Sequence, residues 1–198
     1  MVVQMNDVAG YVQFDFMDGR FVPSVSIIDE DLAGITFKFE WEAHLMVLHP
    51  ETTFAHFKKL GAKRVIFHFE AVDSPGKVIE EARNLGLEVG IAVNPDTPVT
   101  NLVPWVSKID TVLFMTVVPG FYGSKFQPGV LEKIAEFRRQ FPDCHVGVDG
   151  GIKQDNVATL ARAGANDICV GSAIFLQANP AECFRSLQTL AEDAVKLT

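Results

Sequence analysis

The sequence predicts a single α/β domain, residues 1–198, built as a closed (β/α) barrel. Short apolar, β-branched runs alternate with helical segments at a spacing of roughly 25 residues. The runs are almost continuously apolar, as in parallel strands that are buried on both faces. Residues able to do chemistry recur where the runs end. A barrel gathers all those strand ends at one mouth, whereas an open doubly wound sheet binds its ligand mainly at the switch point of its strand order. The barrel is therefore favoured over the open sheet.

Seven runs are expected to be strands, one fewer than the eight of a standard barrel. Helices are expected between and after them, with Ser74 as an N-cap before Pro75 and Gly164 as a helix end. The predicted strands are Tyr11–Phe16, Phe39–Met46, Arg64–Phe69, Glu88–Val93, Thr111–Thr116, His145–Asp149 and Asp167–Val170. The predicted helices are Pro50–Leu60, one from Pro75 to near Gly86, Pro128–Phe141, Gln154–Ala163 and one from Pro180.

The composition excludes several classes of protein. A net charge of -8 with no basic cluster argues against nucleic-acid binding. No window has the roughly 18 uninterrupted apolar residues of a membrane span, and no leader pattern is present, so a soluble, cytoplasmic protein is expected. The three cysteines form no CxxC pair, which argues against a disulfide framework or structural zinc. Cys169 lies in an apolar run and is expected to be a buried, inert thiol.

Two acidic residues end apolar strands, Asp15 and Asp149, and His44 lies near the end of a third. Each has an ordinary interpretation, since a strand-end Asp can cap a turn and a core histidine can be satisfied by hydrogen bonds. Three such residues converging on one mouth favour acid/base catalysis, because proton transfer at carbon from two sides needs opposed groups.

Two glycine-containing turns, Gly150-Gly151 and Gly171-Ser172, each precede a predicted helix. Their free backbone N–H groups could bind one anion, and the loops after the last two barrel strands are where this fold usually holds phosphate. Either turn alone is more often a simple helix entry. Met17, Met46 and Met115 lie beside strand ends, either as core filler or as a low-dielectric lining of the substrate pocket.

Taken together, these motifs resemble the ribulose-phosphate 3-epimerase family from about Val8 to the C-terminus. The related barrels that decarboxylate orotidine phosphate or handle hexulose phosphates use an Asp-x-Lys-x-x-Asp signature, which is absent. The matching stretches are residues 15–23, 44–47, 68–71, 90–98, 115–121, 148–152 and 171–175.

The resemblance implies a TIM-type barrel enzyme of the pentose phosphate pathway that epimerises D-ribulose 5-phosphate and D-xylulose 5-phosphate at C3. Asp15 and Asp149 would be the two bases, acting through a cis-enediolate stabilised by a divalent metal ion, zinc, iron or manganese. The metal would be held by Asp15, His44, Asp149 and the residue at position 13. The phosphate would be held by Gly150, Gly151, Gly171 and Ser172, with Gly123 in a closing loop.

Several positions depart from the family pattern. Gln13 stands where the family has a histidine ligand, and an amide oxygen suits hard cations better than zinc or iron. Val118, Tyr122 and Ser124 alter the phosphate lid, and Glu42 replaces an Asp. The family's first strand and its substrate-contacting Ser have no counterpart, since residues 2–8 align with the helix after that strand.

Two alternatives to the epimerase stay open. The chain could be a degenerate member that binds a phosphorylated ligand with little or no turnover, or a 3-epimerase of allulose phosphate or another ketose phosphate. An uncovered parallel edge exposes unpaired backbone groups, so a homo-oligomer is also expected.

Overall fold

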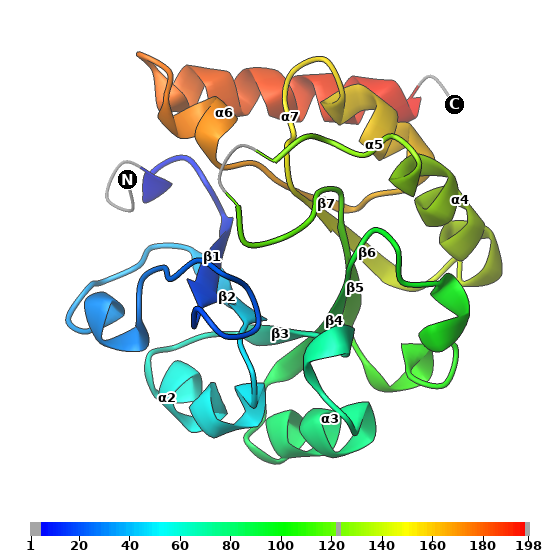
Figure 1. The fold of residues 1–198 in the computed structure, drawn as a ribbon. Helices are drawn as coiled ribbons and strands as arrows, with labels where there is room; N and C mark the ends of the chain where they lie inside the picture. Colours follow the sequence, from blue (N-terminus) through cyan, green and yellow to red (C-terminus); the bar gives the residue numbers. More distant parts are fainter. Residues whose placement is uncertain (1–4, 122–123, 197–198) are drawn as a thin grey trace.

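A computed structural model describes residues 5–121 and 124–196 as seven parallel strands arranged in a nearly closed barrel with helices outside it (Figure 1). Neighbouring strands in the sequence are neighbours in the sheet, so each connection crosses over the outside. This is the predicted TIM-type architecture, and each predicted strand is confirmed to within one residue at both ends. The strands are β1 (Tyr11–Met17), β2 (Glu40–Met46), β3 (Arg64–His68), β4 (Glu88–Val93), β5 (Thr111–Met115), β6 (His145–Asp149) and β7 (Asp167–Cys169).

Helical segments follow the strands and cover the outside of the barrel. None of the helices described is both long and apolar enough to cross a membrane. The α-helices are α2 (Phe54–Lys59), α3 (Pro75–Asn84), α4 (Val130–Gln140), α5 (Val157–Ala163), α6 (Ser172–Phe175) and α7 (Pro180–Lys196). The 3-10 helices are η1 (Asp29–Leu32), η2 (Pro50–Thr53), η3 (Phe69–Ala71), η4 (Val99–Asn101) and η5 (Val106–Lys108).

The structure differs from the predicted helices in several details. The predicted Pro50–Leu60 helix is divided into η2 and α2. Ser74 occupies the N-cap of α3, but its side chain makes no capping hydrogen bond. The helix predicted from Gln154 begins at Val157 instead, because Oδ1 of Asn156 accepts a hydrogen bond from the Lys153 backbone at 2.8 Å and closes a turn first.

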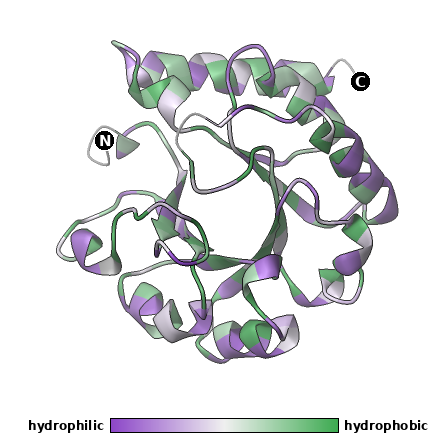
Figure 2. Ribbon diagram, in the orientation of Figure 1, coloured by the Kyte–Doolittle hydropathy of each residue, from purple (hydrophilic) through white to green (hydrophobic). Residues whose placement is uncertain are grey.

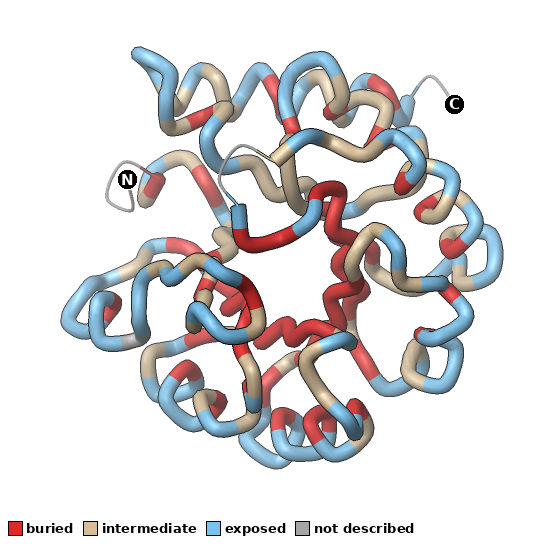
Figure 3. The backbone as a smooth tube through the Cα atoms, viewed as in Figure 1, coloured by how far each residue is buried: buried red, intermediate tan, exposed pale blue. Residues whose placement is uncertain are grey.

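The core has two parts, one on each side of the strands. The larger part lies between the sheet and the helices, where Phe14 and Phe16 of β1 pack against Trp41 and Phe57. A smaller cluster inside the barrel includes Ile66, Ala92, Leu113 and Met115. Figure 2 shows the hydrophobic strands, and Figure 3 shows buried residues along them with exposed residues on the outer helices. Alternate residues of each strand therefore point inward, toward the site, or outward, toward the helices.

Near the N-terminal ends of the strands, the interior holds a charged group that we call the basal ring: Tyr11, Glu42, Arg64, Glu88 and Asp167. Arg64 donates to Glu42 at 3.0 Å and to Glu88 at 3.1 and 3.2 Å, and lies 3.9 Å from Asp167. The Tyr11 hydroxyl donates to Glu42 at 3.1 Å. Burial raises the pKa of Glu42, although the Arg64 charge opposes this rise. The ring therefore pairs the buried charges of Arg64 and Glu42 far from the mouth.

The barrel is open on one side. β1 and β7 are the two ends of the strand order and do not pair with each other. A cavity of about 600 Å³ lies there, lined by both strands and by apolar residues of α5, α6 and α7 such as Val157, Ile174 and Leu187. The same cavity reaches the barrel interior at Asp15 and Asp149. The interior is thus accessible from this side as well as from the mouth.

Replacing Arg64 by Met should strongly destabilise the fold. Its partner Glu42 has a side chain only 4% exposed, and loss of one member of a buried ion pair costs about 3–5 kcal/mol. The measurement is the free energy of unfolding from urea denaturation. Lys63→Met is the matched control, since Lys63 pairs with Glu40 at the surface and its loss should change the free energy of unfolding far less. Equal costs for the two variants would contradict the structural role of the basal ring.

Candidate active site

The site residues are brought together by strand register. Asp15 on β1 pairs directly with His44 on β2, and both face the barrel interior because their neighbours Phe14 and Leu45 pack outward. Asp149 ends β6, on the other side of the interior. Parallel pairing thus places two carboxylates from distant parts of the chain around one imidazole.

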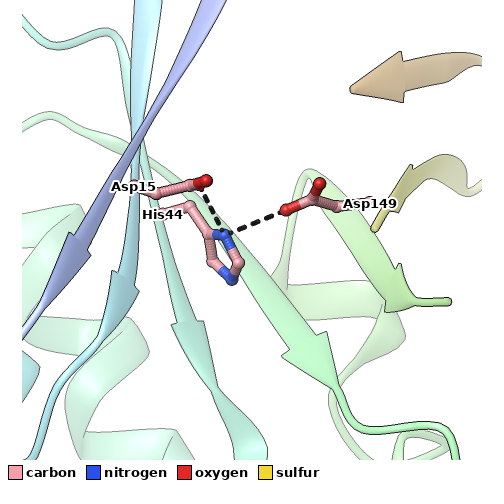
Figure 4. A group of neighbouring side chains, drawn as sticks. All are labelled: Asp15, His44 and Asp149. Carbon is pink, nitrogen blue, oxygen red and sulfur yellow. Dashed lines mark hydrogen bonds and ion pairs between the residues drawn. The ribbon is translucent and has the colours of Figure 1, made fainter. Parts of the chain in front are cut away.

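Nδ1 of His44 is shared by the two carboxylates. It lies 3.0 Å from Oδ1 of Asp15 and 3.4 Å from Oδ2 of Asp149. Figure 4 shows the two Asp side chains approaching the imidazole from opposite sides. His44 is completely buried, whereas the Asp15 side chain is 44% exposed and that of Asp149 17%. The two carboxylates therefore flank a space that is open to solvent on the Asp15 side.

The proximity of these groups changes their acidity. Burial and then the neighbouring Asp15 carboxylate raise the pKa of Asp149 above its ordinary value. Burial alone would lower the pKa of His44, but hydrogen bonds to Asp149 and Asp15 outweigh it and raise this pKa to about 9. The pair of carboxylates thus favours a shared positive charge, whether a proton on His44 or a bound cation.

Gln13 lies in the middle of these groups. Its amide nitrogen donates to Asp15 at 2.9 Å and to Asp149 at 3.0 Å, and is 3.3 Å from Nδ1 of His44. Its oxygen accepts from the Cys169 thiol at 3.1 Å. Burial raises the pKa of Cys169 well above its usual range, so the thiol stays protonated and can donate. Cys169 belongs to β7, so this contact joins the two unpaired edge strands.

Three of these residues can hold a metal ion. One ligand atom each from Asp15, His44 and Asp149 lie within 4.8 Å of one another. Two carboxylates and an imidazole are a ligand set that suits divalent cations of the first transition row. Rotation of the Gln13 amide by half a turn would exchange its nitrogen for its oxygen and offer a fourth ligand. The residues present therefore fit a divalent cation.

A second buried histidine, His68, lies behind His44 and was not among the site residues predicted from the sequence. Nε2 of His68 is 2.9 Å from Nε2 of His44. Nδ1 of His68 is buried without a well-aligned hydrogen-bond partner, and Oε2 of Glu70 lies 3.4 Å from it. Burial lowers the pKa of His68 to about 4. The sequence signal was the strand-end position of His68, two residues before an acidic residue.

The glycine turns lie beside the same space. Gly150 has a φ of 116°, and a Cβ there would overlap Val117, so this turn needs glycine. Gly171 has open space around its Cα and lines the cavity that contains Asp15 and Asp149. Ser172 begins α6, whose Ile174 and Phe175 N–H groups donate to the Gly171 carbonyl, so the N–H groups of Ser172 and Ala173 precede the first intrahelical hydrogen bond. The turns can therefore offer N–H donors to an anion beside the carboxylates.

The remaining predicted positions are also near the mouth. Met17 and Met46 are register neighbours on β1 and β2, and Met115 pairs with Asp149. Met46 and Met115 are buried. Gly123, the predicted lid residue, lies outside the described residues. A second cavity of about 560 Å³ is lined by Val118 and residues 124–129, next to Gly151.

The chain resembles known proteins over almost its whole length. Residues 2–175 match the model of the ribulose-phosphate 3 epimerase family. The ribulose-phosphate 3-epimerase of Schizosaccharomyces pombe is 37% identical over 183 residues, which cover 90% of this chain and 80% of that protein. The cytoplasmic isoform of ribulose-phosphate 3-epimerase from Oryza sativa subsp. japonica is 36% identical over 191 residues, covering 93% and 83%.

Solved structures with low sequence identity share the fold. The phosphoribosyl anthranilate isomerase of Thermococcus kodakaraensis superposes with a TM-score of 0.69 at 11% identity, covering 97% of this chain and 93% of that one. At this identity the likeness concerns the barrel alone. With the family match over residues 2–175, the curated relatives at 36 and 37% identity and the barrel geometry, the chain belongs to the ribulose-phosphate 3-epimerase family.

Proposed function

We propose that this protein interconverts D-ribulose 5-phosphate and D-xylulose 5-phosphate by inverting C3. The observation that carries the proposal is the placement of Asp15 and Asp149 on opposite sides of one space. Inversion at carbon requires a proton to leave one face and another to arrive at the other face, so opposed acid/base groups are needed. The names of the curated relatives support this choice of substrate.

The two carboxylates would exchange roles with the direction of reaction. With ribulose 5-phosphate, one carboxylate removes the C3 proton and the other group, as a carboxylic acid, returns a proton on the opposite face. The raised pKa of Asp149 favours it as the holder of that proton, with Asp15 as the base. The reverse reaction uses them in the opposite order.

The surroundings would stabilise the enediolate between the two proton transfers. Asp15, His44 and Asp149, with Gln13 after rotation of its amide, would hold a divalent cation, zinc, iron or manganese. When bound, the cation supplies Lewis-acid stabilisation of negative charge on the substrate oxygens. Met17, Met46 and Met115 line the mouth with apolar surface, which excludes water and strengthens electrostatic interactions.

The phosphate would lie at the two glycine turns. Gly171 and the two carboxylates line one cavity, so a substrate can reach both with its two ends. The N–H groups near Gly150, Gly151, Gly171 and Ser172 are suited to a phosphate dianion. The cytoplasmic location and the homo-oligomer expected from the sequence stay predictions.

One observation favours a second candidate, a family member that binds a phosphorylated ligand with little or no turnover. The Gln13 amide nitrogen already donates to Asp15 and Asp149, between the atoms that would bind a cation. A cation would have to displace this amide group. A coupled assay of ribulose 5-phosphate epimerisation, made together with a measurement of metal content, distinguishes the two functions. Turnover supports the epimerase, and binding without turnover supports the second candidate.

Gln13→His should increase both metal binding and activity. An imidazole at position 13 restores the ligand that the family pattern has there and removes the competing amide donor. We expect more bound zinc or iron and a rise in kcat/KM on ribulose 5-phosphate of at least about tenfold, ~1.4 kcal/mol of transition-state stabilisation. Metal analysis and the coupled assay measure the two effects.

Gln140→His is the control for this substitution, because Gln140 is exposed at the C-terminal end of α4, on the outside of the barrel. It adds a histidine without adding a ligand to the site and should change neither metal content nor kcat/KM. If Gln13→His behaves like Gln140→His, the residue at position 13 limits neither metal binding nor turnover. If metal content rises and activity does not, metal occupancy is not what limits turnover.

Gly171→Val should raise KM for ribulose 5-phosphate at least about tenfold, because loss of hydrogen bonds to a charged phosphate costs about 1.5–3 kcal/mol. The fold should tolerate the change, since a Cβ added at Gly171 would have nothing within 4 Å and the residue has no positive φ. Gly10→Val is the control, as Gly10 has equally open space and lines the same cavity, but precedes β1 at the end of the barrel opposite the mouth. An unchanged KM for Gly171→Val would remove this phosphate site.

A further inference from the structure

His44 and His68 form a buried pair in which only one of the two facing Nε2 atoms can carry a hydrogen. Their Nε2 atoms are 2.9 Å apart, both residues are completely buried, and the two rings are stacked with centroids 5.1 Å apart. At this distance one nitrogen must donate and the other must accept, since two N–H groups or two lone pairs would repel each other. The groups at the far side of each ring decide which arrangement is adopted.

Glu70 lies at the far side of His68. Its Oε1 accepts the backbone N–H of Asn94 at 2.8 Å and the hydroxyl of Thr97, which fixes the carboxylate. Its Oε2 is then 3.4 Å from Nδ1 of His68. A carboxylate oxygen can only accept, so a lone pair on Nδ1 would face another lone pair inside the protein. The favourable arrangement puts the His68 proton on Nδ1, toward Glu70.

The position of the proton on His68 determines the position of the proton on His44. If His68 carries its proton on Nδ1, its Nε2 accepts, and His44 must donate from its own Nε2. Nδ1 of His44 is then the nitrogen that serves the site, where it lies 3.0 Å from Asp15 and 3.4 Å from Asp149. It can present a lone pair to a cation or a proton to the carboxylates without any change in His68.

We infer that Glu70 and His68 are positioning residues that hold His44 with its Nε2 proton directed away from the site and Nδ1 free to act as a ligand. Neither residue lines the cavity that contains Asp15 and Asp149. Histidine ligands commonly donate their second N–H to an acceptor that fixes the tautomer, and here a second histidine stands between ligand and carboxylate. The inference rests on the proposed role of His44 in the epimerase site.

Glu70→Gln tests this chain of hydrogen bonds with almost no change of shape. The Asn94 N–H still needs an acceptor, so the amide oxygen takes the place of Oε1 and the amide NH₂ points at His68. His68 must then accept on Nδ1 and donate from Nε2, which forces His44 to accept on Nε2 and to carry its proton on Nδ1. The ligand nitrogen of His44 is blocked, so zinc affinity should fall about 10–100-fold.

Two measurements that do not depend on activity follow the effect. In the metal-free protein above about pH 10, where the His44 imidazole is neutral, long-range ¹H–¹⁵N correlation spectra should show His68 protonated on Nδ1 in the wild type and on Nε2 in Glu70→Gln. Titration with zinc alone should show the loss of affinity. Glu51→Gln is the matched control, because Glu51 forms a surface pair with His49 at 3.6 Å and should change neither result.

His68→Phe completes the test. A phenyl ring keeps the contact with Phe21, whose ring centroid is 4.9 Å from that of His68, but transmits no hydrogen bond. In this background Glu70→Gln should cause no further loss of zinc affinity. The inference is overturned if wild-type His68 carries its proton on Nε2, if Glu70→Gln binds zinc as the wild type does, or if the two substitutions act additively. Absence of turnover on ribulose 5-phosphate would overturn the proposed function instead, since the spectra and the zinc titration need no substrate.

Discussion

The site depends on one interaction, the sharing of Nδ1 of His44 between two carboxylates. Asp15 and Asp149 are separated by most of the chain, and two negative charges at this separation in a partly buried place repel each other. The imidazole between them compensates, and their charge raises its pKa to about 9 in return. A cation or a proton at this point is therefore part of the electrostatic balance of the barrel.

The barrel separates this cluster from the other buried charges. The basal ring, centred on Arg64, lies near the N-terminal ends of the strands, whereas the cluster around His44 lies toward the mouth. The barrel interior also contains an apolar layer that includes Ile66 and Leu113. Exposed ion pairs contribute little to stability, whereas a buried charge needs a partner of opposite charge. The basal ring therefore stabilises the fold, and Asp15 and Asp149 remain available for chemistry.

The strands were predictable because their signal is local. Parallel strands buried on both faces are continuously apolar, so β4, for example, was found with both ends correct. The start of α5 was missed, because it depends on one side chain, Asn156, closing a turn that the apolar pattern does not show. The opposed positions of Asp15 and Asp149 followed from the barrel topology, which puts both strand ends at one mouth.

Other features of the site could not be read from the sequence. The orientation of the Gln13 amide depends on the hydrogen bond that its oxygen accepts from the Cys169 thiol on β7. No spacing rule connects residues so far apart in the chain. The role of His68 depends on its ring lying against His44, although the alternation of inward and outward residues along β3 indicated that it faces the interior. Such side-chain contacts are set by three-dimensional packing.

Inversion of C3 by two opposed carboxylates can be followed by NMR of ribulose 5-phosphate in D₂O with the wild type and with Asp15→Asn and Asp149→Asn. The wild type should form xylulose 5-phosphate with deuterium at C3, and each variant should lose net epimerisation. The base that remains in each variant should exchange the C3 proton of one epimer, a different epimer in each case. Exchange of the same epimer in both variants, or full epimerisation by either of them, would rule out the two-base mechanism.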